Sequence, residues 1–344
     1  MIFDEIMAEI TAGLTGNPED DKQYLILQID KYKKNEYANE IARAIGRILY
    51  KLLSNEERKE VCQIFDNLTL GIETSLEEAE FQMYKNNYNK ALEIIEPLIA
   101  KIEEKGWYKS DSVSDYRCFD NIFEEIIYKE IFKPSKDVRK IPENYTKAYY
   151  IYGIILFELK KYNEARKILE KANEYNPVST DVLFELSETY KVKQEWDGYL
   201  RINNDCLKYA YSSKALARCY RNYGFYFIEK TNYDMAAMLF FLSMNYDEDS
   251  KMAQSELLYI SKKTGEMPHP TSIENTMKLL KIHNIQSGAN QLILGLAYSI
   301  AKVAQESKNN NMAKNFYEIF YDLTKDDEIK NIIDSLDEAE DTRE

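Results

Sequence analysis

Apolar residues recur every three or four positions along most of this 344-residue chain, which is the spacing of one face of an α-helix. The stretch 146–179, TKAYYIYGIILFELKKYNEARKILEKANEYNPVS, shows the pattern most clearly. Its apolar and small positions are, in order, Tyr149, Tyr152, Gly153, Leu156, Ala165, Leu169 and Ala172. A short polar stretch separates the two runs. The pattern therefore predicts two antiparallel amphipathic helices.

Gly153 and Ala165 lie twelve residues apart and are the small members of this pattern. Small side chains let two helix backbones approach at a crossing, and bulky neighbours fill the space beside them. Pro177 lacks a backbone N–H and ends the second helix. This order of bulky, small and proline positions resembles the tetratricopeptide repeat, a helix–turn–helix unit that stacks into arrays.

Two further copies follow the first along the chain. Residues 217–250 match well, with Gly224 and Ala236 at the small positions. Residues 180–213 form a degenerate copy, because Tyr199 stands where a small residue is expected. Three repeats are therefore expected between residues 145 and 250.

Looser copies flank these three. Residues 72–105 carry Ala79 and Ala91 twelve positions apart, with the same Tyr-Asn pair before the second helix. Near the C-terminus, Gly295 and Ala313 are eighteen positions apart, which predicts a first helix longer by more than a turn.

The remaining sequence divides around these copies. Ser54 and Glu57 form a capping-box pattern that begins a helix within an N-terminal helical region without the small-residue spacing. Such a region is typical of the atypical terminal repeat that covers the open end of an array. The predicted regions are an N-terminal helical capping region (1–71), a degenerate repeat with an irregular helix and loops (72–144), three consecutive repeats (145–250), and a C-terminal repeat-like region with an acidic tail (251–344).

The periodicity is lost between residues 106 and 144. We interpret 114–133 as one long helix and 134–142 as an exposed connecting loop. Four basic residues cluster there, Lys133, Lys136, Arg139 and Lys140. We expect Lys136, Arg139 and Lys140 to be exposed, mobile and without a structural role. The acidic tail from Asp334 to Glu344 is expected to fray.

The resemblance implies an all-α fold, an α-solenoid of antiparallel helix pairs wound into a right-handed superhelix. It also implies a concave groove lined by the first helix of each repeat, where a peptide or a partner helix binds. The groove positions of the three central repeats are Lys147, Tyr150, Ile154, Phe184, Glu188, Arg218, Arg221, Asn222 and Phe225. Family members that clamp a chaperone's C-terminal carboxylate place Lys and Asn where this chain has Tyr150 and Ile154, so that clamp is absent.

Two interpretations of the cationic groove residues stay open. In one, Asn222 holds a peptide backbone while Arg218 and Arg221 meet an acidic side chain or terminus. In the other, the two arginines pair with Glu185 and Glu188 of the neighbouring repeat and contribute only to the fold.

Charge and composition narrow the classes of partner. The net charge of −14 opposes binding to a phosphate backbone, so nucleic acid is excluded as a general partner. The N-terminus is acidic where a signal peptide is basic, and no apolar run is long enough to span a membrane. The four cysteines fall in helical patterns and are interpreted as buried thiols in a reducing cytoplasm. The 28 tyrosines are interpreted as large core residues rather than a recognition surface.

The sequence offers no pattern of catalytic or metal-binding residues. His269 and His283 have no histidine or cysteine at metal-ligand spacing, and neither a phosphate loop nor a nucleophile elbow is present. We therefore expect no cofactor, no metal and no enzymatic activity. The expected function is a protein- or peptide-binding scaffold; the alternatives are a sensor of a short signalling peptide, as in bacterial helical-repeat receptors, and an acidic decoy for a basic partner.

Overall fold

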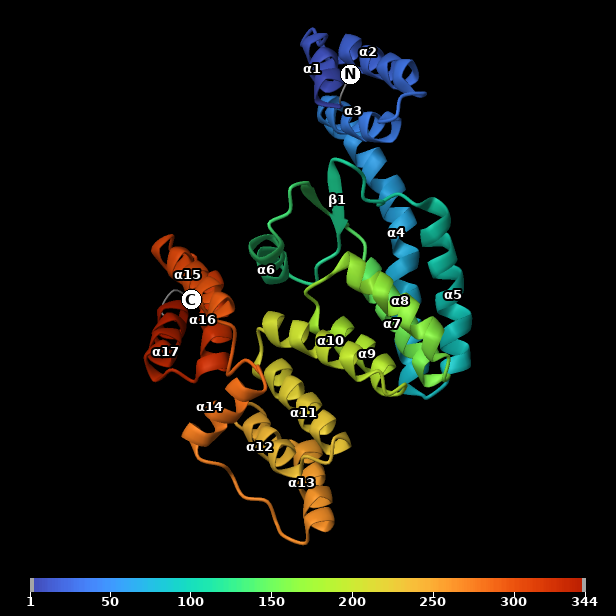
Figure 1. The fold of residues 1–344 in the computed structure, drawn as a ribbon. Helices are drawn as coiled ribbons and strands as arrows, with labels where there is room; N and C mark the ends of the chain where they lie inside the picture. Colours follow the sequence, from blue (N-terminus) through green and yellow to red (C-terminus); the bar gives the residue numbers. More distant parts are fainter. Residues whose placement is uncertain (1–2, 342–344) are drawn as a thin grey trace. The chain divides into compact units, whose positions relative to one another are not determined.

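The computed structural model describes residues 3–341, except the side chains of Asn39, Arg43, 58–71 and 338–341. Within that range the chain forms seventeen helices and two four-residue strands (Figure 1). The contacts divide it into two compact units, Met1–Cys118 with Pro134–Ile151 and Phe119–Lys133 with Tyr152–Glu344. The fold is all-α and is built from antiparallel helix pairs that follow one another along the chain, as the sequence predicts.

The first unit begins with a small helical core. It is formed by α1 (Phe3–Ala12), α2 (Pro18–Tyr32) and α3 (Ala38–Leu52). Its fully buried side chains are Ile6, Ile10, Leu25, Ile41 and Ile45. The spacing of these residues places one apolar stripe on each helix, and burying the three stripes together stabilises the module.

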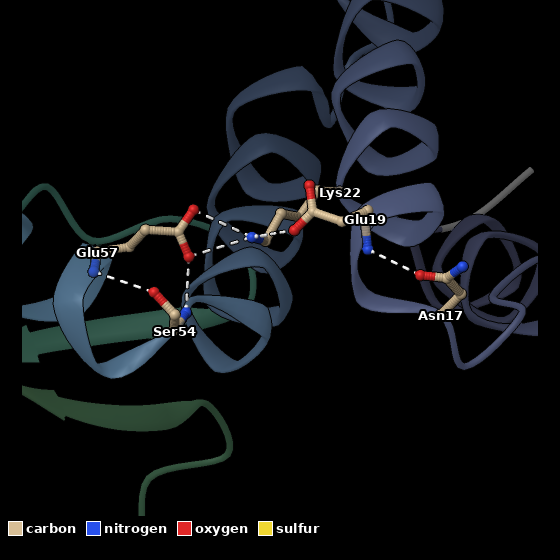
Figure 2. Close-up of polar contacts among 5 residues, drawn as sticks. All are labelled: Asn17, Glu19, Lys22, Ser54 and Glu57. Atoms are coloured by element: carbon tan, nitrogen blue, oxygen red, sulfur yellow. Dashed lines mark hydrogen bonds and ion pairs between the residues drawn. The ribbon is translucent and has the colours of Figure 1, made fainter.

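A polar cluster joins α2 to the start of α4 (Asn55–Tyr84) (Figure 2). The predicted capping box is present, because the Glu57 backbone N–H donates to Ser54 and the Ser54 N–H donates to the Glu57 carboxylate. Lys22 Nζ lies 3.1 Å from Glu57 and 2.8 Å from Glu19. The Ser54 backbone N–H first, and then Lys22, lower the pKa of Glu57 to about 2.

Helix α4 is longer than the sequence pattern suggests. The helix predicted to begin at the capping box and the first helix of the 72–105 copy are one continuous 30-residue helix. A single glycine such as Gly71 costs only about 1 kcal/mol inside a helix, which is too little to end one. Helix α5 (Tyr88–Lys105) packs back against α4, and Ala79 and Ala91 are both fully buried.

The interpretation of residues 114–142 is wrong in two places. Residues 114–133 are not one helix, since β1 (Ser114–Arg117) is followed by α6 (Ile122–Phe132). The predicted loop contains β2 (Asp137–Lys140), which pairs with β1 in parallel. The side chains of Ser110 and Asp111 accept hydrogen bonds from β1 backbone N–H groups, and this holds the backbone extended.

The basic residues of this segment also differ from the prediction. Arg139 Nε donates to Ser114 Oγ at 2.9 Å, and its guanidinium pairs with Asp137. Lys136 pairs with Asp115 at 3.6 Å. Arg139 and Lys136 therefore have structural roles in the sheet, whereas Lys140 is exposed, as expected.

The second unit contains the central repeats. The second unit takes in helix α7 (Tyr145–Glu158) from Tyr152 onward. Successive helices pack against one another from α8 to α13 and again from α15 to α17. The helices after α7 are α8 (Tyr162–Tyr175), α9 (Thr180–Lys191), α10 (Trp196–Tyr209), α11 (Ser213–Glu229), α12 (Tyr233–Met244), α13 (Lys251–Thr264), α14 (Ile273–Ile282), α15 (Gln291–Glu306), α16 (Asn310–Thr324) and α17 (Asp327–Asp341).

The predicted crossings are present at the glycines of the central repeats. A Cβ added to Gly153 would lie 2.5 Å from Leu169, and one added to Gly224 would lie 2.8 Å from Phe240. Ala165 and Ala236 opposite them are fully buried. These four residues are small because larger ones would hold the helices apart.

A common turn closes the helix pairs. The residue seven positions after each small residue has positive φ, and the next residue donates its N–H back to the carbonyl five positions earlier. The positive-φ residues are Asn86, Lys160, Gln194, Thr231 and Lys308. This is the Schellman motif, which satisfies the free carbonyls at a helix end.

The turn at Lys308 corrects the register of the C-terminal pair. Counting back seven positions gives Ala301, which is fully buried and lies twelve residues before Ala313. Nothing lies within 4 Å of a Cβ added to Gly295, so Gly295 is not the crossing residue. The predicted longer first helix is therefore wrong, and the pair has the standard spacing.

Two further features complete the second unit. Helix α6 packs through Phe123 against Tyr211 and Phe316, and its Glu124 is buried.

The tail predicted to fray is helical up to Asp341, because Ile329, Ile333 and Leu336 form a buried stripe on α17. Residues 342–344 lie outside the described residues.

Candidate functional site

The first helices of neighbouring repeats present a continuous polar surface in the second unit. Arg218 of α11 reaches Glu185 of α9 at 3.0 Å, and its guanidinium lies 4.4 Å from the centre of the Phe184 ring. Lys191 Nζ of α9 lies 4.1 Å from the centre of the Phe225 ring on α11. These contacts show that the predicted groove positions of α9 and α11 face one another.

The two predicted arginines have different partners. Arg218 pairs with Glu185, as the structural interpretation expected, but Arg221 pairs with Asp247 in the turn before α13, at 2.8 Å. Glu188 pairs with Lys191 instead. The sequence analysis missed Asp247 and Lys191, although Lys191 lies seven residues after Phe184, on the same face of α9.

Arg221 has a donor without a partner. Its side chain is 13% exposed, one terminal nitrogen binds Asp247, and its Nε is buried with no hydrogen-bond partner among the described residues. A buried donor left unsatisfied costs about 1–3 kcal/mol. Burial raises the pKa of the nearby Glu185 carboxyl, an effect that Arg218 opposes.

Asn222 and Phe184 are less accessible than predicted. The Asn222 side-chain amide donates to Asn203 Oδ1 at 3.0 Å, and its backbone carbonyl accepts from the Tyr199 hydroxyl. Phe184 is 2% exposed beneath Arg218. Both residues support the surface from below, and Tyr199, the bulky residue of the degenerate copy, is part of that support.

The remaining predicted groove residues lie on α7. Ile154 belongs to the second unit and is half-buried. Lys147 and Tyr150 belong to the first unit, where Lys147 Nζ pairs with Glu80 of α4 at 3.0 Å. Lys147 is therefore engaged by the preceding helix pair of its own unit.

The second unit also contains a cavity that the sequence analysis missed. Its volume is about 490 Å³. It is lined mainly by apolar residues of α12, of α14 and of the loop between α13 and α14, among them Met238, Phe241, Leu242, Pro270, Ile273 and Met277. Ile273 and Met277 lie four residues apart on one face of α14, and both are largely exposed. This pair of apolar residues is the sequence signal that could have indicated the cavity.

Within the described side chains, no three His, Cys, Asp or Glu residues gather as metal ligands would. Cys118, Cys206 and Cys219 are buried and form no disulfide, and burial raises the pKa of the Cys206 thiol. Cys62 lies outside the described side chains. Across residues 3–341, no helix has the length and apolar character of a membrane span.

Comparisons with known proteins give one distant structural neighbour to report. No protein-family model and no curated protein matches this chain. A chain of the crystal structure of the APC/C hetero-tetramer Cut9–Hcn1 aligns over 94% of this chain, with 15% sequence identity and a TM-score of 0.31. The alignment covers 61% of that chain, so the present chain spans less than two thirds of its length.

The class of protein follows from the helix pairs themselves. Their small-residue crossings twelve positions apart and their shared turn define a tetratricopeptide-like helical-repeat protein.

Proposed function

We propose that this chain is a non-catalytic scaffold that binds a protein or peptide on the surface formed by α9, α11 and α13. The observation that carries the proposal is the unpartnered Nε of Arg221. Because this Nε is buried, a ligand carboxylate or carbonyl oxygen would reach it only with a shift of the Arg221 side chain, and would then gain the strength of a charge-assisted bond. The ligand class is an acidic side chain or a chain terminus.

The surroundings of Arg221 support a peptide rather than an isolated anion. Arg218 pairs with Glu185 and Lys191 pairs with Glu188, so these four charges largely compensate one another. The partly buried Phe225 on α11 and the exposed Leu258 on α13 supply apolar surface. A peptide that binds there would combine one acidic group with at least one apolar side chain.

The test compares two arginines with similar environments. Arg221→Gln removes the guanidinium of the proposed surface. The control Arg166→Gln removes a guanidinium on α8 that pairs with Glu195, the residue before α10, and bonds Thr189 of α9. We expect Arg221→Gln to weaken capture of the natural partner at least tenfold, while Arg166→Gln leaves capture unchanged at similar stability. Equal capture by both variants would contradict the proposal.

The alternative function is a sensor of a short signalling peptide, and the cavity beside α12 and α14 favours it. Its volume of about 490 Å³ suits a small ligand or one or two bulky side chains. Native mass spectrometry of the purified chain separates the two functions, since a sensor would retain an oligopeptide and a scaffold would retain a longer protein. The buried, unbridged Cys118, Cys206 and Cys219 support a reducing compartment such as the cytoplasm.

A further inference from the structure

The two strands of the first unit have different outer edges. In the parallel register, Ser114 lies opposite Asp137 and Arg117 opposite Lys140. The N–H of Asp137 donates to Val113 and that of Ile141 donates to Arg117, so every second residue of β2 faces β1. The backbone groups of Val138 and Lys140 therefore point away from β1.

The outer edge of β1 is closed by the loop before it. Asp111 Oδ1 accepts from the Ser114 N–H at 2.7 Å, and Ser110 Oγ accepts from the Tyr116 N–H at 3.0 Å. The Asp111 N–H donates to the Ser114 carbonyl at 2.9 Å. With these groups occupied, no further strand can pair with β1.

The outer edge of β2 is open. Among the described residues, the backbone N–H and C=O groups of Val138 and Lys140 have no hydrogen-bond partner. Asp137 and Lys140 are exposed, and Val138 is partly exposed. An exposed edge with free backbone groups is a template for an added strand.

The charges around this edge indicate which strand would fit. Residues 136–140 read Lys-Asp-Val-Arg-Lys and carry an excess of positive charge in a chain whose net charge is −14. Lys140 has no ion-pair partner among the described residues. An added strand with acidic side chains opposite these positions gains cross-strand attraction.

A second copy of this chain fits poorly. Antiparallel pairing through Val138 and Lys140 can centre on Val138, Arg139 or Lys140. The register centred on Val138 places Lys136 opposite Lys140 but also Asp137 opposite Arg139, so its attractive and repulsive pairs offset. The other two registers place Arg139 opposite Arg139 or Lys140 opposite Lys140, which destabilises a strand pair. A second copy therefore gains no net attraction between charges in any register.

We propose that the free edge of β2 binds an extended, acidic segment of a partner protein as a third strand. The backbone groups of Val138 and Lys140 supply the hydrogen bonds, and Lys140, which has no ion-pair partner among the described residues, selects an acidic side chain. This surface belongs to the first unit and does not depend on the surface around Arg221.

The test uses the full chain and two fluorescein-labelled heptapeptides, Glu-Val-Glu-Val-Glu-Val-Glu and its Lys-for-Glu counterpart. We expect the acidic probe to bind at least tenfold more tightly by fluorescence anisotropy. Val138→Pro removes one outward N–H, and we expect it to weaken that binding at least tenfold. Val138→Thr keeps the N–H and should bind like the parent chain.

A second measurement leaves the protein unchanged, in case Val138→Pro disturbs the fold. Two versions of the acidic probe are N-methylated at alternate residues, one at the odd and one at the even positions. In an extended strand only one of these sets of N–H groups faces β2, so methylation of that set should abolish binding. Equal binding of the acidic and basic probes would overturn the proposal. Full binding of both methylated probes, the odd and the even, would also overturn it. Concentration-dependent dimerisation that Val138→Pro abolishes would overturn it in favour of a second copy.

Discussion

The repeat turns and the segment around the two strands both reverse the chain, but they satisfy its backbone groups by different means. In the turn at Gln194, the backbone closes on itself, because the Glu195 N–H donates to the Tyr190 carbonyl. Before β1, the side chains of Ser110 and Asp111 accept the bonds instead. A turn closed by backbone atoms accepts many residue types, whereas one closed by side chains depends on particular residues.

This difference predicts opposite responses to substitution. In the repeats, stability depends on the small residues at the crossings and little on the residues of the turns. In the segment that interrupts them, stability depends on individual polar side chains. The following predictions test each part, starting with the largest expected effect.

Gly153→Leu should destabilise the chain by about 3 kcal/mol. Even a Cβ at this position meets Leu169 at 2.5 Å, and overpacking a helix crossing forces the backbones apart. The matched control is Gly295→Leu, whose Cβ meets nothing within 4 Å and which gains helix propensity. Chemical denaturation measures both. An unchanged free energy of unfolding for Gly153→Leu would refute the assigned crossing.

Glu124 on α6 should make stability depend on pH near neutrality. Burial first, and then the charge of Asp120, raise the pKa of Glu124 to about 7, although Asn176 and Tyr211 donate to its carboxylate. Because the pKa is raised in the folded state, the protonated Glu124 carboxyl contributes to the free energy of unfolding. This contribution is complete below the unfolded-state pKa near 4.5. That contribution is lost as the pH rises through 7.

The expected loss attributable to Glu124 between pH 5 and pH 8 is about 2 kcal/mol. Glu124→Gln should remove this part of the pH dependence. Glu57 provides the comparison, because its pKa of about 2 keeps its contribution constant over the same range. If unfolding of the parent chain and of Glu124→Gln responds identically to pH, the buried carboxyl is already ionised at pH 5.

Asp111→Ala should destabilise the first unit by about 1 kcal/mol, because it leaves the N–H groups of Val113 and Ser114 without their acceptor. Gln194→Ala, in a backbone-closed turn, should change stability by less than about 0.5 kcal/mol. Limited trypsin digestion gives a local readout: cleavage at Lys136 to Lys140 should be slow in the parent chain and faster in Asp111→Ala. Rapid cleavage of the parent chain there would mean that β2 is not formed.

The same contrast explains what the sequence could and could not predict. The crossings at Gly153 and Gly224 were predictable, because each requires a small residue at a fixed distance from the next. The strands were not, since β1 forms through side-chain acceptors that have no periodicity. Ala301 was overlooked because Gly295 offered a more conspicuous small residue, and only the turn at Lys308 resolves the register.

The candidate site was predictable only in part. The register of α9 and α11 placed Arg218 and Phe225 on the side of α11 that contacts α9. The partner of Arg221 could not be read from that register, because Asp247 lies in a turn outside the two helices. The inaccessibility of Asn222 depends on Asn203, which occupies a position where the repeat pattern expects an apolar residue.

Thr231→Gly should stabilise the chain by about 1 kcal/mol. Thr231 has φ of 57° in the turn between α11 and α12, and a β-branched residue is strained in this conformation while glycine is not. Its hydroxyl bonds only the carbonyl of Lys230, so little is lost with the side chain. The neighbouring Glu229→Gly serves as the control, since Glu229 is the last residue of α11 and glycine there should destabilise. If both variants lose stability, the threonine side chain supports the turn, and the repeat turns are not closed by the backbone alone.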